Sequence, residues 1–284
     1  MSDCAAHSKR IIAGLALVAG LALPVAAEGP RRVVSINLCT DLLAMQMAAP
    51  GQLVSVSNLA ADPHSSVMAA EAAAYPANYG LAEEVFLLKP DLVVAGEYTA
   101  RATTSLLERL GIPVVKFAPA TSLDDIPMHL ERMGAALGRE TEAQAMIEAF
   151  NADRAALAPT GDDLRPLAAL YYANGYSTGL NTLSGRVLDA AGLRNAAAEA
   201  GLVRGGTLPL EVLIMAAPDM VIRGNRYPGA SRSEDILDHP ALAHLGASSE
   251  TPILADRDWI CGTPRILDVV ARLTEARATL EDAR

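Results

Sequence analysis

Short apolar runs alternate with amphipathic segments along the first part of the chain. Four runs have the length and composition of buried strands, at residues 32–36, 53–57, 91–95 and 112–117. Segments with helical periodicity lie among them, at residues 41–48, 81–88 and 103–110. Residues 58–79 have no clear period and contain Pro63 and Pro76, so we expect a long loop with a helical turn. This alternation predicts a parallel, doubly wound sheet.

The alternation then stops and later resumes. Ser122 is expected to open one helix, and Thr141 with Gln144 forms a capping-box pattern for a second, which runs to about Leu157 before Pro159. Strand and helix patterns return at residues 167–172, 185–191, 210–216 and 220–223. The sequence therefore predicts two doubly wound α/β lobes, residues 28–138 and 161–284, joined by one long rigid helix, residues 139–160.

An internal repeat links the two predicted lobes. Residues 83–96 match residues 211–224: each copy starts with a glutamate, has Pro-Asp seven residues later, and continues into an apolar strand that ends in glycine. Proline ends the helix and favours an extended chain. Two such lobes facing each other would form a ligand cleft beyond the carboxyl ends of their strands.

The N-terminal 27 residues have the pattern of a cleavable signal peptide. Lys9 and Arg10 precede an apolar run at residues 11–23, and Val25-Ala26-Ala27 supplies small residues for cleavage. The alternative is a retained anchor, although the run is short for a bilayer. The only cysteine near the run, Cys4, precedes it, so we expect a periplasmic protein that is not lipidated.

The composition narrows the range of partners. The formal net charge is −10, and no basic stripe interrupts the acidic balance, which argues against nucleic acid and anionic membrane surfaces as partners. Nothing in the pattern predicts an oligomer, so we expect a monomer.

These motifs, in this order, resemble the helical-backbone (class III) periplasmic substrate-binding proteins of ABC importers for iron–siderophores, haem and vitamin B12. The segments that carry the resemblance are residues 88–93, 110–114 and 210–221, together with Asp258-Trp259 and Pro264-Arg265-Ile266. The resemblance implies that the protein is not an enzyme and has no cofactor of its own. It implies instead that the protein binds a small-molecule metal chelate and delivers it to the permease of an ABC transporter in the inner membrane.

The resemblance leaves the chelate open. Asp258-Trp259 and the Pro-Arg-Ile segment point to a corrinoid such as cobalamin, but a tryptophan expected in the first lobe is replaced near Tyr79. We therefore expect a ferric siderophore, with cobalamin or haem as alternatives. The resemblance also implies that Glu83 and Glu211 dock onto permease arginines; alternatively, both are ordinary solvated glutamates.

Candidate ligand-binding residues are those near predicted strand ends or in the long loop. Aromatic rings suit flat chelates and arginines suit anionic oxygens, although each also has an ordinary structural role. The candidates are His64, Tyr79, Tyr98, Asn174, Tyr176, Arg223, Arg226 and Trp259. We expect no metal ion bound directly by protein ligands, because there is no histidine-rich loop.

Cys39 and Cys261 fall at the predicted cleft edges, one in each lobe. If paired, they would tether the lobes, which requires Cα atoms within about 7 Å.

A function of another class is suggested by residues 175–179, which match the G-x-S-x-G pattern of a serine hydrolase with Ser177 as nucleophile. Four residues intervene before the next predicted helix, so its N-terminus would not support an oxyanion. A non-transport sensor or scaffold on the same fold is a third possibility.

Overall fold

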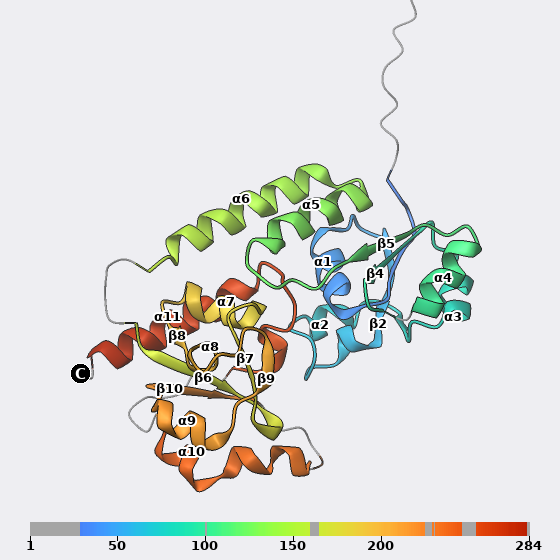
Figure 1. The fold of residues 1–284 in the computed structure, drawn as a ribbon. Helices are drawn as coiled ribbons and strands as arrows, with labels where there is room; N and C mark the ends of the chain where they lie inside the picture. Colours follow the sequence, from blue (N-terminus) through green and yellow to red (C-terminus); the bar gives the residue numbers. More distant parts are fainter. Residues whose placement is uncertain are drawn as a thin grey trace, which may run out of the picture.

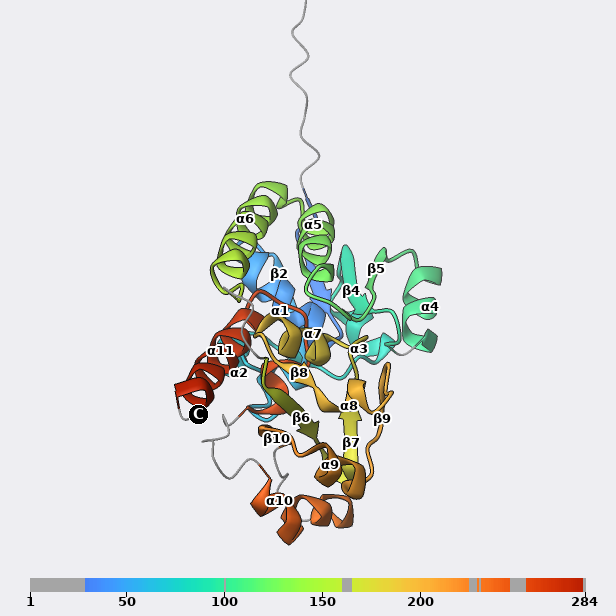
Figure 2. The same cartoon turned by 60° about the vertical axis from the view of Figure 1, so that its left-hand side comes forward.

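The computed structural model describes residues 29–99, 101–159, 165–224, 229, 231–245 and 254–282. Within them the chain forms two α/β lobes, with a pair of long helices lying along one side (Figure 1). The two views in Figures 1 and 2 show this pair, α5 and α6, side by side above the lobes. The predicted signal peptide at residues 1–27 lies outside the described residues and stays a prediction.

The N-terminal lobe is built on a parallel five-stranded sheet, as the alternating pattern predicted. Its strands follow the spatial order β3 (Ala77–Asn78), β2 (Leu53–Ser57), β1 (Val33–Ser35), β4 (Leu92–Gly96) and β5 (Val114–Phe117). Its helices are α1 (Leu38–Met47), α2 (Ala69–Ala72), α3 (Ala82–Leu87) and α4 (Arg101–Arg109), with a 3-10 turn η1 (Asn58–Ala61). Strands β1, β2 and β4 are buried almost throughout, so this sheet is covered on both faces.

Two local features of this lobe differ from the sequence prediction. The helix α1 begins at Leu38, three residues earlier than expected, because the Asn37 side chain caps it by accepting the backbone N–H of Cys39 at 3.1 Å. The segment expected to be a loop contains strand β3, where the buried Asn78 amide donates to the carbonyls of Ser35 and Val56, each at 2.9 Å. A single buried amide thus ties a two-residue strand to the sheet.

The helices between the lobes form a hairpin. Helix α5 (Asp125–Leu137) ends at Gly138, which has φ +67°, and α6 (Glu140–Ala156) follows at once. They approach closely because a Cβ at Gly134 would lie 2.4 Å from the Cβ of Ala143. The predicted capping box is wrong: α6 begins one residue before Thr141, and its N-cap residue, Arg139, makes no side-chain capping bond. Likewise, Asp125 rather than Ser122 begins α5, and its carboxylate accepts the backbone N–H groups of Thr121 and Ser122.

The C-terminal lobe contains a smaller sheet. Three parallel strands follow the order β10 (Met220–Arg223), β6 (Leu167–Tyr171) and β8 (Arg194–Asn195), and an antiparallel pair is formed by β7 (Tyr176–Thr178) and β9 (Gly205–Thr207). The helices are α7 (Leu183–Ala190), α8 (Ala196–Glu199), α9 (Leu210–Ala216), α10 (Pro240–His244) and α11 (Ile266–Asp282). Short 3-10 turns complete the lobe: η2 (Ala173–Gly175), η3 (Arg232–Asp238) and η4 (Asp256–Asp258).

The sequence repeat is also a structural repeat. Helix α3 leads into β4 and helix α9 into β10, and the residue before each proline, Lys89 or Ala217, has a positive φ of 50° or 44°. The aspartate after each proline then binds the backbone where the first strand of its lobe begins. Asp91 accepts from Arg31 and Arg32, at 2.8 and 2.9 Å, and Asp219 accepts from Leu167 at 2.7 Å.

A buried carboxylate lies beneath the N-terminal sheet. Asp41, in the first turn of α1, is fully buried and accepts hydrogen bonds from the hydroxyl and the backbone N–H of Ser57. Burial raises the pKa of Asp41 from 3.8 to about 6, while hydrogen bonds from Ser35 and Ser57 oppose the shift. At neutral pH the fold therefore contains a carboxylate that is poorly solvated.

This raised pKa predicts a pH-dependent stability. Between pH 4 and 6 the native state retains a proton on Asp41 that the unfolded chain has lost, so the free energy of unfolding falls as pH rises. The fall amounts to about 3 kcal/mol and is complete above pH 6. Asn at this position keeps an acceptor for Ser57 but carries no charge. We therefore expect Asp41→Asn to be more stable than the wild type at pH 8 and to lack this decline, as measured by urea unfolding from pH 4 to 8.

Asp62→Asn provides the matched control, because hydrogen bonds from Ser65 and His64 lower the pKa of this exposed aspartate. The control should retain the decline between pH 4 and 6. If Asp41→Asn also retained it, burial of Asp41 would not be its source.

Candidate functional site

A cavity of about 370 Å³ lies where strands β1, β4 and β5 end in the N-terminal lobe. Residues following these strands line it, together with residues from α1, α5 and the C-terminal part of the chain. The lining comprises Asn37, Cys39, Thr40, Leu43, Gly96, Glu97, Tyr98, Thr99, Phe117, Ala118, Pro119, Ala120, His129, Ile260 and Gly262. Ligands of open α/β sheets bind at such strand ends, so this cavity is the candidate ligand site.

Tyr98 is the predicted ligand residue that the structure places in this cavity. It follows β4 and its side chain is 70% exposed. The backbone before it is closely packed, because a Cβ at Gly96 would lie 2.8 Å from the Thr99 hydroxyl and 3.0 Å from the Asn37 side chain. A free phenol at the edge of a partly apolar cavity can stack on a flat ligand or supply oxygen to a metal centre.

His129 also lines the cavity, although the sequence pattern did not single it out as a ligand residue. His129 lies on α5, and its ring meets that of Phe117 edge-on with centroids 6.0 Å apart. Burial lowers the pKa of His129, Arg132 lowers it further and Asp125 opposes the change, so the ring is neutral at pH 7. Its placement depends on how α5 packs over the end of β5, which helical periodicity does not reveal.

A second hollow continues from the first along α5. Its volume is about 490 Å³, and it shares Glu97, Ala118 and His129 with the candidate site. It adds two cationic side chains. Arg132 stacks over Phe117, 5.6 Å from the ring centroid, and Lys116 pairs with Glu108 at 2.8 Å. The N-terminal half of the site is therefore open and partly aromatic. The Arg132 guanidinium lies at its border, where Lys116 is paired with Glu108 and Glu97 adds a carboxylate.

Two predicted residues of the first lobe lie elsewhere. Tyr79 follows the edge strand β3 and is as exposed as Tyr98, at 71%, but it does not line the cavity. His64 lies in a surface turn, where its ring contacts Asp62 at 3.2 Å. The long loop carries both residues away from the ends of β1, β4 and β5, so the structure does not bring them to the site.

The predicted residues of the second lobe are grouped around the end of its sheet. Tyr176 begins β7 with its ring 6.5 Å from that of Tyr172, Asn174 lies in the preceding turn with φ +56°, and Arg223 ends β10 with an exposed side chain. None of the three lines the candidate cavity. Arg226 falls outside the described residues.

The expectation for Trp259 needs correction. Its side chain is only 5% exposed and belongs to the main hydrophobic core, together with Leu254 and Ile266. The position after η4 is near the candidate cavity, but the indole turns into the core instead of towards the ligand space. A large apolar ring gains more from this burial than from partial exposure.

The serine hydrolase hypothesis is contradicted by the structure. Ser177 is fully buried in β7, and its hydroxyl donates to the carbonyl of Leu170 at 2.6 Å. No helix begins directly after it, since α7 starts at Leu183. Ser177 therefore stabilises the lobe by joining β7 to β6.

Cys39 and Cys261 form a disulfide in the structure, with S–S at 2.10 Å and Cα atoms 5.2 Å apart. Cys39 lies in the first turn of α1, and Cys261 lies between η4 and α11. The bond therefore connects the N-terminal lobe directly to the C-terminal part of the chain, beside the candidate cavity.

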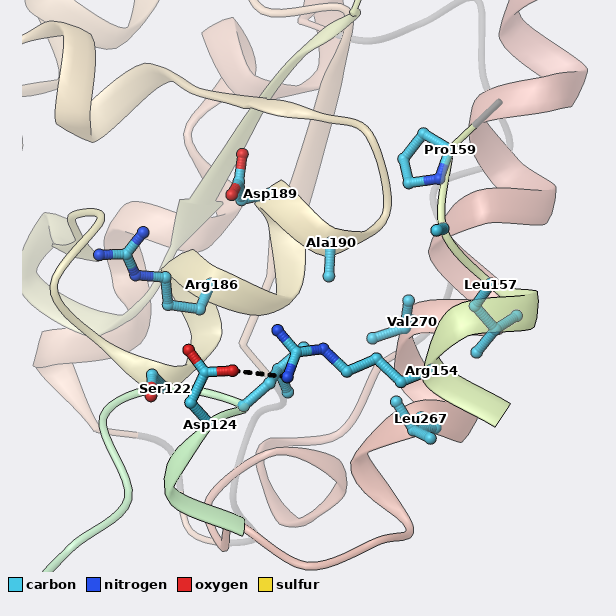
Figure 3. A pocket seen from close by; sticks show the side chains of 12 residues that line it. Ser122, Asp124, Arg154, Leu157, Pro159, Arg186, Asp189, Ala190, Leu267 and Val270 are labelled. Carbon is cyan, nitrogen blue, oxygen red and sulfur yellow. Dashed lines mark hydrogen bonds and ion pairs between the residues drawn. The ribbon is translucent and has the colours of Figure 1, made fainter. Parts of the chain in front are cut away.

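A larger cavity, of about 470 Å³, lies beside the end of α6 (Figure 3). Arg154 of α6 reaches across to Asp124 at 2.6 Å, and Leu157, Leu267 and Val270 supply apolar walls. Both carboxylates of this cavity are paired, because Asp189 also binds Arg165 at 2.7 Å. This cavity lies at the base of the helical hairpin and not at strand ends, so we do not assign the ligand to it.

The described part of the chain shows neither a cluster of metal ligands nor a membrane-spanning helix. No three His, Cys, Asp or Glu side chains gather there as ligands for a metal ion. No helix among the same residues is both long and apolar enough to cross a membrane.

The chain is similar in sequence to a known protein family and to a cobalamin-binding protein. A family model described as periplasmic binding protein matches residues 33–257. A cobalamin-binding protein of Halobacterium salinarum is 28% identical over 263 residues, which cover 87% of this chain and 69% of that protein.

Solved structures of similar fold include two haem-binding proteins. The periplasmic haem-binding protein RhuT of Roseiflexus sp. RS-1, in apo form, has a TM-score of 0.72 and 26% identity, covering 90% of this chain and 99% of that one. The periplasmic haem-binding protein HutB of Vibrio cholerae has a TM-score of 0.71 and 19% identity, covering 86% and 97%.

The disulfide leads to a direct prediction. Iodoacetamide should add no mass to the unfolded mature protein unless a reductant is present, and two labels after reduction, because Cys39 and Cys261 are the cysteines that remain after residue 27. The measurement is intact-protein mass spectrometry in denaturant. Two labels without reductant would show that the purified protein does not contain this bond.

Proposed function

Because the chain belongs to the periplasmic binding protein family, we propose that it captures a metal chelate at the cavity beyond β1, β4 and β5 and delivers it to an ABC importer. Members of this family are substrate-binding components of such importers, which implies a permease partner. We propose further that the mature chain begins after Ala27 and works in the periplasm without a lipid anchor.

The observation that carries the ligand proposal is the chemistry of the cavity. Tyr98 supplies an exposed phenol, Phe117 an aromatic wall and Arg132 a guanidinium in the adjoining hollow. Lys116 is paired there with Glu108, and Glu97 adds a carboxylate. Guanidinium and ammonium groups favour carboxylate and catecholate oxygens. Phenol oxygen is also a hard donor that suits Fe³⁺. These features support an anionic ferric chelate, and we propose a ferric siderophore as the ligand.

Haem is the second candidate, since it combines a flat macrocycle with two carboxylates and since RhuT, at 26% identity, is a haem-binding protein. The relative from Halobacterium supports cobalamin as a third. The Arg132 guanidinium favours the first two chelates, because an uncharged corrinoid ring gains little from it.

We propose that Glu83 and Glu211 contact the permease. Both side chains are exposed in the first turn of α3 or α9, and the helices occupy equivalent places in the two lobes. Each glutamate is followed by two exposed apolar residues on the next turn, Phe86 and Leu87 in one copy and Ile214 and Met215 in the other. Residues three and four positions apart share a helix face, so each lobe presents a carboxylate beside an apolar patch.

The ligand proposal is tested by titrating the mature protein with ferric hydroxamate, catecholate and citrate chelates, haem and cyanocobalamin. We expect saturable binding of one ferric chelate, measured by isothermal titration calorimetry. Tyr98→Phe should weaken it about tenfold, because it removes one oxygen contact. Tyr79→Phe is the matched control, since Tyr79 is equally exposed but outside the cavity. Equal affinity of both variants would remove Tyr98 from the site, and a protein that binds none of the five would refute the chelate proposal.

The docking proposal makes a separate prediction. Glu83→Ala with Glu211→Ala should abolish chelate-dependent growth in cells that rely on this importer, while the purified variant keeps the wild-type affinity for the chelate. Glu84→Ala with Glu199→Ala is a control pair of other helical glutamates outside the repeat position. Normal growth of the Glu83/Glu211 variant would show that these carboxylates are ordinary surface groups.

A further inference from the structure

Two residues from the C-terminal part of the chain, on either side of Cys261, form one edge of the cavity in the N-terminal lobe. Ile260 and Gly262 line the cavity next to Cys39 and Thr40 of α1. The Ile260 side chain is 57% exposed and therefore presents an apolar surface at this edge. The first lobe alone would therefore leave the cavity open on this side.

Close packing holds this segment against the N-terminal lobe. Cys261 is buried in a small apolar cluster with Leu38, Leu42 and Met68. A Cβ at Gly262 would lie 2.3 Å from the Cβ of Ala120, so the backbone can approach this closely only at glycine.

The covalent bond is the strongest of the connections along this seam. The others are a hydrogen bond from the Arg257 guanidinium to the Pro63 carbonyl and an ion pair between Arg265 and Glu71 at 3.4 Å. These side chains are partly or largely exposed to solvent, and such contacts contribute little on their own. The disulfide, in contrast, fixes Cys261 to the first turn of α1, whose neighbouring residues also line the cavity.

We propose that the Cys39–Cys261 disulfide is a positioning element of the ligand site: it holds Ile260–Gly262 in place as a wall of the cavity, so the oxidised protein binds its chelate more tightly than the reduced one. This inference rests on the proposed chelate-binding function. With the bond intact, the wall is ordered before the ligand arrives. Without it, only packing holds the wall, so the wall is less well ordered before the ligand arrives, and the freedom lost on binding weakens affinity.

The first experiment compares the oxidised mature protein, the same protein reduced with a phosphine, and Cys39→Ser/Cys261→Ser. Each is titrated with the five chelates named above at a temperature where circular dichroism shows it to be folded. For the chelate that the oxidised protein binds, both forms lacking the bond should bind about tenfold more weakly. Equal dissociation constants would overturn the inference and leave the chelate proposal standing. If the oxidised protein bound none of the five, the proposed function and this inference would both fail.

A second experiment displaces the wall without touching the disulfide. Gly262→Ala introduces the close contact with Ala120 and should weaken chelate binding while mass spectrometry shows the bond intact. Gly262→Ala/Ala120→Gly removes the contacting methyl group and should restore the affinity, and Ala120→Gly alone is the control. Unchanged affinity of Gly262→Ala would show that this segment is not a wall of the ligand site. That result would overturn the inference.

Discussion

Two aspartates determine where the strands of each lobe begin. Asp91 and Asp219 follow the prolines that end α3 and α9, and each accepts backbone N–H groups at the start of the first strand of its lobe. Because all strands of a parallel sheet run in one direction, their carboxyl ends lie at the same edge. The ends of β1, β4 and β5 consequently meet at one edge, where their last residues and the loops that follow can surround a ligand. The candidate site is thus a consequence of contacts at the opposite edge of the sheet.

The repeated helix–strand unit is placed alike in both lobes, but the lobes are not equivalent. The first has five parallel strands, whereas the second has three parallel strands and a separate antiparallel pair. The candidate cavity lies in the lobe with the five-stranded sheet, and the other lobe contributes a short segment of backbone and one isoleucine to it. Duplication of the unit therefore explains the matched outer surfaces of α3 and α9 better than it explains the site.

Much of the fold follows from the sequence because its signals are local. Apolar runs, proline and helical periodicity place most of the strands and helices, and the repeat shows that two similar units exist. The same reasoning places Tyr98 at a strand end. It fails where the direction of a side chain depends on tertiary packing: Trp259, after η4, and Ser177, within β7, turn inward, and His129 reaches the cavity from a helix. His64 shows the same limitation, since a loop of more than fifteen residues does not reveal which way it folds.

The α5–α6 hairpin contacts the N-terminal lobe at its tip, along α5 and at its base. Gly138 at its tip touches Gly29 at the start of the N-terminal lobe, α5 packs on α1, and Arg154 near its base returns to Asp124, where the hairpin began. The end of α6 also lies beside the second lobe, where Arg154 and Leu157 line a cavity together with residues of α7 and α11. The chain crosses to the second lobe after Leu157, and the disulfide makes a second crossing. Two covalent connections at separate places restrict how the lobes can move relative to each other more than a single connection would.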